Sequence, residues 1–192
     1  MSGSLYYTSK IHIQRSDSAV KEYIWIFPVL FVFHDFEEII GFGIWYNKNK
    51  QKLKNKYPKI AIMLDKMFSD YSTEGMAIAV LEELTLCIVV CILGMYFDMY
   101  VLWIGVFIIF VIHMIMHIVQ SAFWGNYVPS LITSIIEIPI SIIIIYQCLM
   151  INPITIGEII KWSIIGLILI LVNLKFAHFL MHKFTRWKNR LI

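Results

Sequence analysis

The stretch from residue 24 to residue 45 constrains the fold most, because it is long enough to cross a bilayer yet carries polar groups at its centre. It reads IWIFPVLFVFHDFEEIIGFGIW and holds His34, Asp35, Glu37 and Glu38. A helix that spans the hydrocarbon core needs about 20 predominantly apolar residues. A charged side chain at its centre costs roughly 2.5–3.5 kcal/mol even on a lenient insertion scale. The rest of the chain must therefore supply partners for these groups.

The composition places the chain among integral membrane proteins, since 59% of its 192 residues are hydrophobic. We predict an all-α, polytopic membrane helix bundle of about five transmembrane helices. A tail or interfacial segment at 1–23 precedes the membrane domain at 24–184, and a basic cytoplasmic tail at 185–192 follows it. No basic face with interleaved aromatic residues is present, so nucleic acid is not an expected partner. The expected helices cover about 24–45, 74–96, 101–123, 129–150 and 159–184.

The distribution of lysine and arginine predicts the orientation. Six lysines lie between Lys48 and Lys59, in a segment that we interpret as a loop, and the C-terminal tail is also basic. With five spans, this loop and the tail lie on the same side of the membrane. The positive-inside rule then places the N-terminus outside and the C-terminus in the cytoplasm of the cell membrane.

The same topology brings the polar intramembrane residues to one depth. Each of these residues lies about six to ten residues from the cytoplasmic end of its helix, and His182 lies a turn closer to that end. At 1.5 Å per residue, this spacing defines a layer roughly 10–12 Å below the cytoplasmic boundary of the membrane. His113 and His117 are four residues apart and share a helix face, as do His178 and His182. The predicted metal ligands in this layer are His34, Glu37, Glu38, Glu83, His113, His117, Glu137, His178 and His182.

The charge balance favours metal ions. Six acids, Asp35, Glu37, Glu38, Glu82, Glu83 and Glu137, lie in apolar stretches. Ionised and unpaired in hydrocarbon, they would cost on the order of 15–20 kcal/mol. Two divalent ions would offset most of this cost, and a set of imidazoles and carboxylates suits iron, zinc or manganese. Carboxylate-bridged pairs of ions occur in four-helix bundles with similar ligands. We therefore predict a binuclear centre, with Glu38 and Glu82 as catalytic carboxylates.

The residues His34, Asp35, Phe36, Glu37 and Glu38 form an HxxEE motif. Together with the later segments LEELT, HMIMH and HFLMH, this motif resembles the family of membrane proteins named after HXXEE. The resemblance covers most of the spanning region. It implies several transmembrane helices and a polar site within them, but no particular reaction.

A membrane-embedded metalloenzyme is the first functional hypothesis. In a hydrolytic version, a metal ion lowers the pKa of bound water and a free glutamate accepts its proton. In an oxidative version, a di-iron centre activates oxygen against a lipid-like or small apolar substrate. The depth of the layer suggests access from the cytoplasm or the inner leaflet. Motifs for zinc proteases of the HExxH type, serine hydrolases and phosphate loops are missing from the sequence.

Other classes remain open from the sequence. Chains of intramembrane Glu and His also mark transport pathways for metal ions or protons. A conduit would spread polar groups over the full depth, whereas here they cluster in one half. Haem held by two histidines would explain the histidine pairs but not the carboxylates. A purely structural polar network is the simplest alternative. Membrane lipids are expected partners, and a homo-oligomer is compatible with the sequence.

Overall fold

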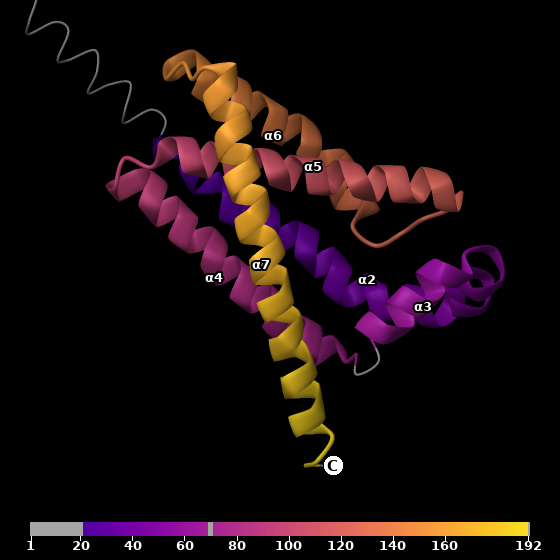
Figure 1. Cartoon of the computed structure of the whole chain (residues 1–192). Helices are drawn as coiled ribbons and strands as arrows, with labels where there is room; N and C mark the ends of the chain where they lie inside the picture. Colours follow the sequence, from indigo (N-terminus) through magenta and orange to yellow (C-terminus); the bar gives the residue numbers. More distant parts are fainter. Residues whose placement is uncertain (1–20, 69–70, 192) are drawn as a thin grey trace, which may run out of the picture.

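The computed structural model describes residues 21–68 and 71–191 of the chain, and all regular structure in this part is helical. Of the predicted N-terminal segment 1–23, only the last three residues fall within the described range. The helices are arranged as a bundle (Figure 1). They are α2 (Ile26–Lys56), α3 (Pro58–Met67), α4 (Thr73–Tyr96), α5 (Tyr100–Trp124), α6 (Leu131–Ile151) and α7 (Ile156–Lys188).

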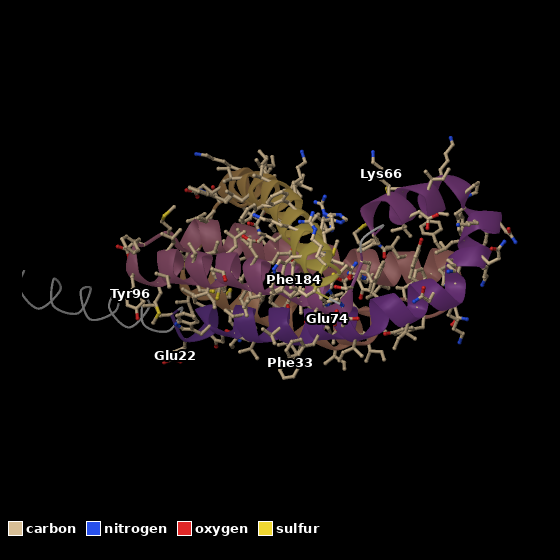
Figure 2. The ribbon with its side chains drawn as sticks, turned by 90° about the horizontal axis from the view of Figure 1, so that it is seen from below. Glu22, Phe33, Lys66, Glu74, Tyr96 and Phe184 are labelled. Carbon is tan, nitrogen blue, oxygen red and sulfur yellow. The ribbon has the colours of Figure 1, made fainter. Side chains whose placement is uncertain are left out.

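Four of these helices, α4 to α7, are long and apolar enough to cross a membrane. The predicted all-α membrane bundle is thus confirmed. The expected span at 24–45 falls in α2, which is long enough at 31 residues but is not among the four, because three acids interrupt its apolar half and five lysines occupy the other half. It nevertheless packs against α4 and α6 within the bundle. Its outer face is apolar, and Figure 2 shows Phe33 pointing away from the other helices there; Phe33 is 62% exposed.

The lysine-rich segment is helical, so its interpretation as a loop was wrong. α2 continues without a break through Lys56. Lysine is a good helix former, and Lys54 and Lys56 lie in the last turn, where positive charge interacts favourably with the helix dipole. Leu53 is buried on the inner side of this extension. α3 then folds back against α2, and the two helices form a hairpin joined at Tyr57.

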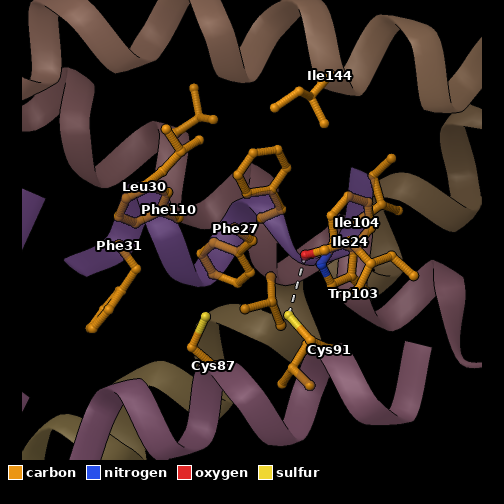
Figure 3. Close-up of a cluster of buried hydrophobic side chains, with 14 of the residues drawn as sticks. Ile24, Phe27, Leu30, Phe31, Cys87, Cys91, Trp103, Ile104, Phe110 and Ile144 are labelled. Atoms are coloured by element: carbon orange, nitrogen blue, oxygen red, sulfur yellow. Dashed lines mark hydrogen bonds between the residues drawn. The ribbon is translucent and has the colours of Figure 1, made fainter. Parts of the chain in front are cut away.

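The apolar core lies around α5, whose Trp103, Phe107 and Met114 are fully buried. Phe27 of α2 packs on Phe107 with ring centroids 5.1 Å apart. Figure 3 shows this cluster, including the Cys91 thiol that donates to the Ile24 carbonyl oxygen at 3.4 Å. All three cysteines of the chain are buried and free. This core fixes the position of α2 against α4 and α5, one turn away from His34.

α7 crosses over α4 and α5 (Figure 1), and glycine permits the closest approach. A Cβ atom added to Gly105 would lie 2.6 Å from the backbone carbonyl carbon of Trp162. One added to Gly166 would lie 3.2 Å from the backbone of Val106. Backbone therefore packs directly on backbone at this crossing, which sets how near α7 lies to the polar residues of α4 and α5.

Candidate metal centre

Three histidines from two helices converge in the bundle; His34 and His117 are buried, whereas His113 is exposed. His34 comes from α2, and His113 and His117 come from adjacent turns of α5. One nitrogen from each ring lies within 4.8 Å of the other two. His113 Nε2 and His117 Nε2 are 3.1 Å apart. In the part of the chain that the structure describes, this is the one compact group of three metal-ligand side chains.

The His34 ring is held from both sides. The Thr133 hydroxyl lies 3.3 Å from its Nδ1 atom, and Phe110 packs edge-on against it with centroids 5.5 Å apart. Ser130 Oγ also donates to the His34 carbonyl oxygen at 3.1 Å. The side chain is fully buried, and its Nε2 atom has no hydrogen-bond partner. A buried ring nitrogen without a partner is costly, so this atom is available to bind a ligand.

Glu37 does not join the histidines, because its carboxylate is used at the start of α6. It accepts hydrogen bonds from the Tyr127 hydroxyl at 2.8 Å and from the Ile132 amide at 3.3 Å. Thr133 donates to it twice, from its amide at 2.8 Å and from its hydroxyl at 2.7 Å. A carboxylate at a helix N-terminus satisfies amides that have no partner within the helix and interacts favourably with the helix dipole. Glu37 therefore anchors α2 to α6.

Glu38, the next residue, lies beside the cluster. Its Oε1 atom is 3.7 Å from His117 Nε2. The two glutamates of the motif thus have different surroundings, although both lie on the side of α2 that carries His34. Spacing along α2 alone does not distinguish these surroundings.

The acids of α4 lie on the side of the cluster that faces α7. Asn173 of α7 donates to Glu82 Oε2 at 2.8 Å. Glu83 lines a cavity together with Asp35 and His113. Asp35 is buried and lies within electrostatic range of Glu38, Glu83 and also Glu137 of α6. These carboxylates form an acidic region next to the histidines.

The remaining predicted ligands differ in position. Glu137 is buried on α6, and its Oε2 atom has no hydrogen-bond partner. His178 of α7 contacts Phe68 with ring centroids 6.2 Å apart, close to the α3–α4 connection. His182 lies one turn further along α7. Neither belongs to the compact group formed by His34, His113 and His117.

Two apolar cavities border the histidines. The first, of about 310 Å³, lies between α2, α4, α5 and α7, and we call it the α7 cavity. His113, Asp35, Glu83 and Asn173 are its polar lining residues. The second, of about 580 Å³, lies between α2, α3 and α5, and we call it the hairpin cavity. Polar lining groups of the hairpin cavity include Glu38, His117 and Gln120. The three histidines can therefore be reached from two sides.

Thr133, Tyr127 and Ser130 are the residues of the site that the ligand pattern of the sequence did not reveal. They lie in the turn before α6 and in its first turn. The available signal was the start of a helix, where amides without helical partners require acceptors. A partly buried acid from another helix, Glu37, is such an acceptor.

A family model described as a protein of unknown function with HXXEE motif matches residues 25–144. The match includes His34, Glu37, Glu38, both α5 histidines and Glu137, and it ends before α7. No curated protein and no solved structure matches the chain.

Proposed function

The chain belongs to the family of proteins of unknown function with an HXXEE motif, and we propose that it is a membrane metalloenzyme whose first metal ion is held by His34, His113 and His117. The observation that carries this proposal is the convergence of three imidazoles from α2 and α5, with a buried His34 nitrogen that has no partner.

The donor set fits a transition metal. Zinc binds imidazole nitrogen at about 2.0–2.1 Å, so two nitrogens on one ion are at most about 4.2 Å apart. The 3.1 Å between His113 Nε2 and His117 Nε2 lies within this limit. Three histidines with a further open position are typical of catalytic rather than structural zinc sites. Iron and manganese suit the same ligands when carboxylates take part.

A second ion would use the acidic region beside the cluster. Asp35 lies within electrostatic range of Glu38, Glu83 and Glu137, and Asp35 and Glu83 line the same cavity. A divalent ion would offset their mutual repulsion and the cost of their burial. Glu83 and Glu137 are the carboxylates proposed for this position, and the centre is then binuclear, with Glu38 beside it. Glu37, whose oxygens accept hydrogen bonds from the start of α6, is proposed to position α2 rather than to bind metal. His178 and His182 remain candidate ligands outside the compact group of histidines.

Within this site a bound metal supplies Lewis acidity or, as iron, oxygen chemistry. Glu38 is the proposed proton acceptor, because its carboxylate lies beside His117 and borders the hairpin cavity. Glu82, bonded to Asn173, holds an amide at the wall of the α7 cavity, where it can orient a bound molecule.

The proposed substrate is lipid-like or a small apolar molecule, since both cavities have mainly apolar walls. We propose a cell-membrane location with the N-terminus outside and the C-terminus in the cytoplasm, supported by the basic residues of the α2–α3 hairpin and the end of α7. Substrate would then enter from the inner leaflet.

Metal analysis tests the proposal. Protein is purified in mild detergent without chelators or a metal-binding tag, and metals are quantified by inductively coupled plasma mass spectrometry. A binuclear centre gives about two ions of iron, zinc or manganese per chain. One ion per chain would retain the histidine site and remove the carboxylate site. No stoichiometric metal, also after anaerobic purification, would overturn the proposal in favour of a proton- or ion-conducting bundle.

A further inference from the structure

The hairpin cavity is elongated along α2. On this helix its wall runs from Glu38 through Phe42 and Trp45 to Leu53. The fifteen residue-to-residue steps from Glu38 to Leu53 correspond to roughly 22 Å of helix. The facing wall on α5 extends from Met116 to Trp124, roughly 12 Å, and α3 closes the outer end. Such a shape accommodates an extended hydrocarbon chain better than a compact solute.

The two ends of this cavity differ in charge. Glu38 and His117 lie at the inner end. At the outer end, Lys52 Nζ lies 4.5 Å from the centroid of the Trp124 ring, and Lys56 Nζ lies 5.1 Å from that of Tyr57. Both rings line the cavity. Two ammonium groups are thereby held at its outer rim.

These two ammonium groups have no acidic partner among the described residues. Lys54, between them, pairs with Asp65 at 3.3 Å. Lys52 and Lys56 contact aromatic rings instead. Cation–π contacts at exposed positions contribute only about 0.5–1 kcal/mol, so both lysines can still bind an anion.

We propose that the hairpin cavity binds an anionic lipid, with its hydrocarbon chain along α2 and its phosphate or carboxylate headgroup paired with Lys52 and Lys56. This proposal names the substrate class of the proposed enzyme. It rests on the proposed function for one step only, namely that the hydrocarbon chain of the lipid is presented to a metal ion beside His117. Binding of the lipid itself does not depend on metal. A phospholipid and a free fatty acid share this chemistry.

The α7 cavity does not offer the same complementarity. Its polar lining residues are Asp35, Glu83, His113 and Asn173, and no lysine or arginine lines it. Carboxylates in an apolar cavity repel an anionic headgroup. An anionic lipid therefore discriminates between the two cavities.

Tryptophan quenching by brominated lipids tests the proposal, because bromine atoms on an acyl chain quench rings that they contact and Trp45 and Trp124 line the cavity. The full chain in mild detergent is titrated with phosphatidylglycerol carrying brominated chains. Phosphatidylcholine with the same chains controls for headgroup charge, and a brominated fatty acid distinguishes the two anionic sources. We expect saturable quenching by an anionic lipid at lower concentration than by phosphatidylcholine. Equal quenching by all three lipids overturns the proposal.

Charge variants sharpen this test. Lys52→Gln combined with Lys56→Gln removes both rim cations and should raise the half-quenching concentration roughly tenfold or more, at about 1 kcal/mol for each lysine near the membrane surface. Lys48→Gln combined with Lys50→Gln makes the same charge change on α2 and is the matched control. If both double variants bind as the parent protein does, or lose binding equally, the assignment of Lys52 and Lys56 is wrong.

A substitution that enlarges a side chain in the cavity wall tests whether the hydrocarbon chain of the lipid enters the hairpin cavity. Val119 lines it, whereas its neighbour Ile118 does not. Val119→Phe should weaken quenching, and Ile118→Phe should leave it unchanged. If Ile118→Phe weakens quenching and Val119→Phe does not, the hydrocarbon chain does not enter the cavity. Metal content measured on the same samples separates the two proposals. Quenching without metal contradicts the proposed function alone, and metal without anion-selective quenching contradicts this inference alone.

Discussion

The Thr133 hydroxyl donates its proton to Glu37 Oε2, 2.7 Å away. A hydroxyl has one proton, and the carboxylate is its closest acceptor, so the oxygen of Thr133 is left to accept from His34 Nδ1 at 3.3 Å. This places the imidazole proton on Nδ1 and leaves the lone pair on Nε2, the nitrogen without a hydrogen-bond partner. Metal-bound histidines are commonly fixed in this way by a hydrogen bond from the second nitrogen.

Removal of the Thr133 hydroxyl should weaken the first metal site. We expect Thr133→Val to lower metal affinity about 10- to 100-fold, as for other partners of metal-bound histidines. Thr133→Ser, which retains the hydroxyl, should restore most of the affinity. The measurement is competition with a chromophoric chelator, with circular dichroism as the control for folding. Equal affinity in the valine and serine variants would show that this hydroxyl does not orient His34.

Removal of single ligands should separate the two proposed ions. His34→Ala or His117→Ala should abolish binding of the first ion, because only two of the three imidazoles would then remain. Glu83→Ala should reduce the content by the second ion alone. His178→Ala, on a histidine outside the group, is the control and should retain both ions. Metal analysis of the four purified variants gives the answer, and full retention in both His34→Ala and Glu83→Ala would exclude the site.

Gly105→Ala should destabilise the bundle by about 1–3 kcal/mol, the usual cost of overpacking. The added Cβ would lie 2.6 Å from the backbone of Trp162, so α5 and α7 would have to separate. Gly157→Ala is the matched control, because outside its chain neighbours and its own helix backbone no atom lies within 4 Å of the added Cβ. That change should be neutral or stabilise by up to about 1 kcal/mol. Thermal unfolding in detergent measures both, and an equal melting temperature for the two variants would contradict direct backbone packing.

Asp65 should hold α3 against α2. It accepts a hydrogen bond from the Tyr46 hydroxyl and pairs with Lys54 at 3.3 Å. The Tyr46 hydroxyl, and then Lys54, lower the pKa of Asp65 below its usual value. A lowered pKa means that this stabilisation is complete above the unfolded-state pKa and is lost as the pH falls through the folded-state pKa. The hairpin should therefore stay closed at neutral pH.

Asp65→Asn removes the charge and should loosen the hairpin at neutral pH, which faster tryptic cleavage at its lysines would reveal. Asp98→Asn makes the same change at the α4–α5 turn, where a positive φ of 56° is compatible with asparagine. This control should leave cleavage unchanged. Identical digestion of both variants would show that Asp65 does not hold α3.

Local spacing along a helix predicts which of its side chains share a face. Residues four apart on a helix share a face, so His113 and His117 were expected to act together, and the structure brings them to 3.1 Å. The same rule placed His34 with Glu38 and His178 with His182. It describes one helix only, and the neighbours of each helix decide which of its residues converge. Glu37 meets the start of α6, whereas Glu38 meets His117.

The sequence by itself determined the all-helical membrane bundle, because uninterrupted apolar stretches of this length have few alternatives in lipid. It also showed that His34 and the acids near it need partners, because burying charge is costly. Only the tertiary structure decided which partners those are. Close packing of Gly105 on α7 and of Phe27 on α5 sets the distances between helices. Contacts between residues remote in sequence depend on such packing, which the periodicity of a single helix does not predict.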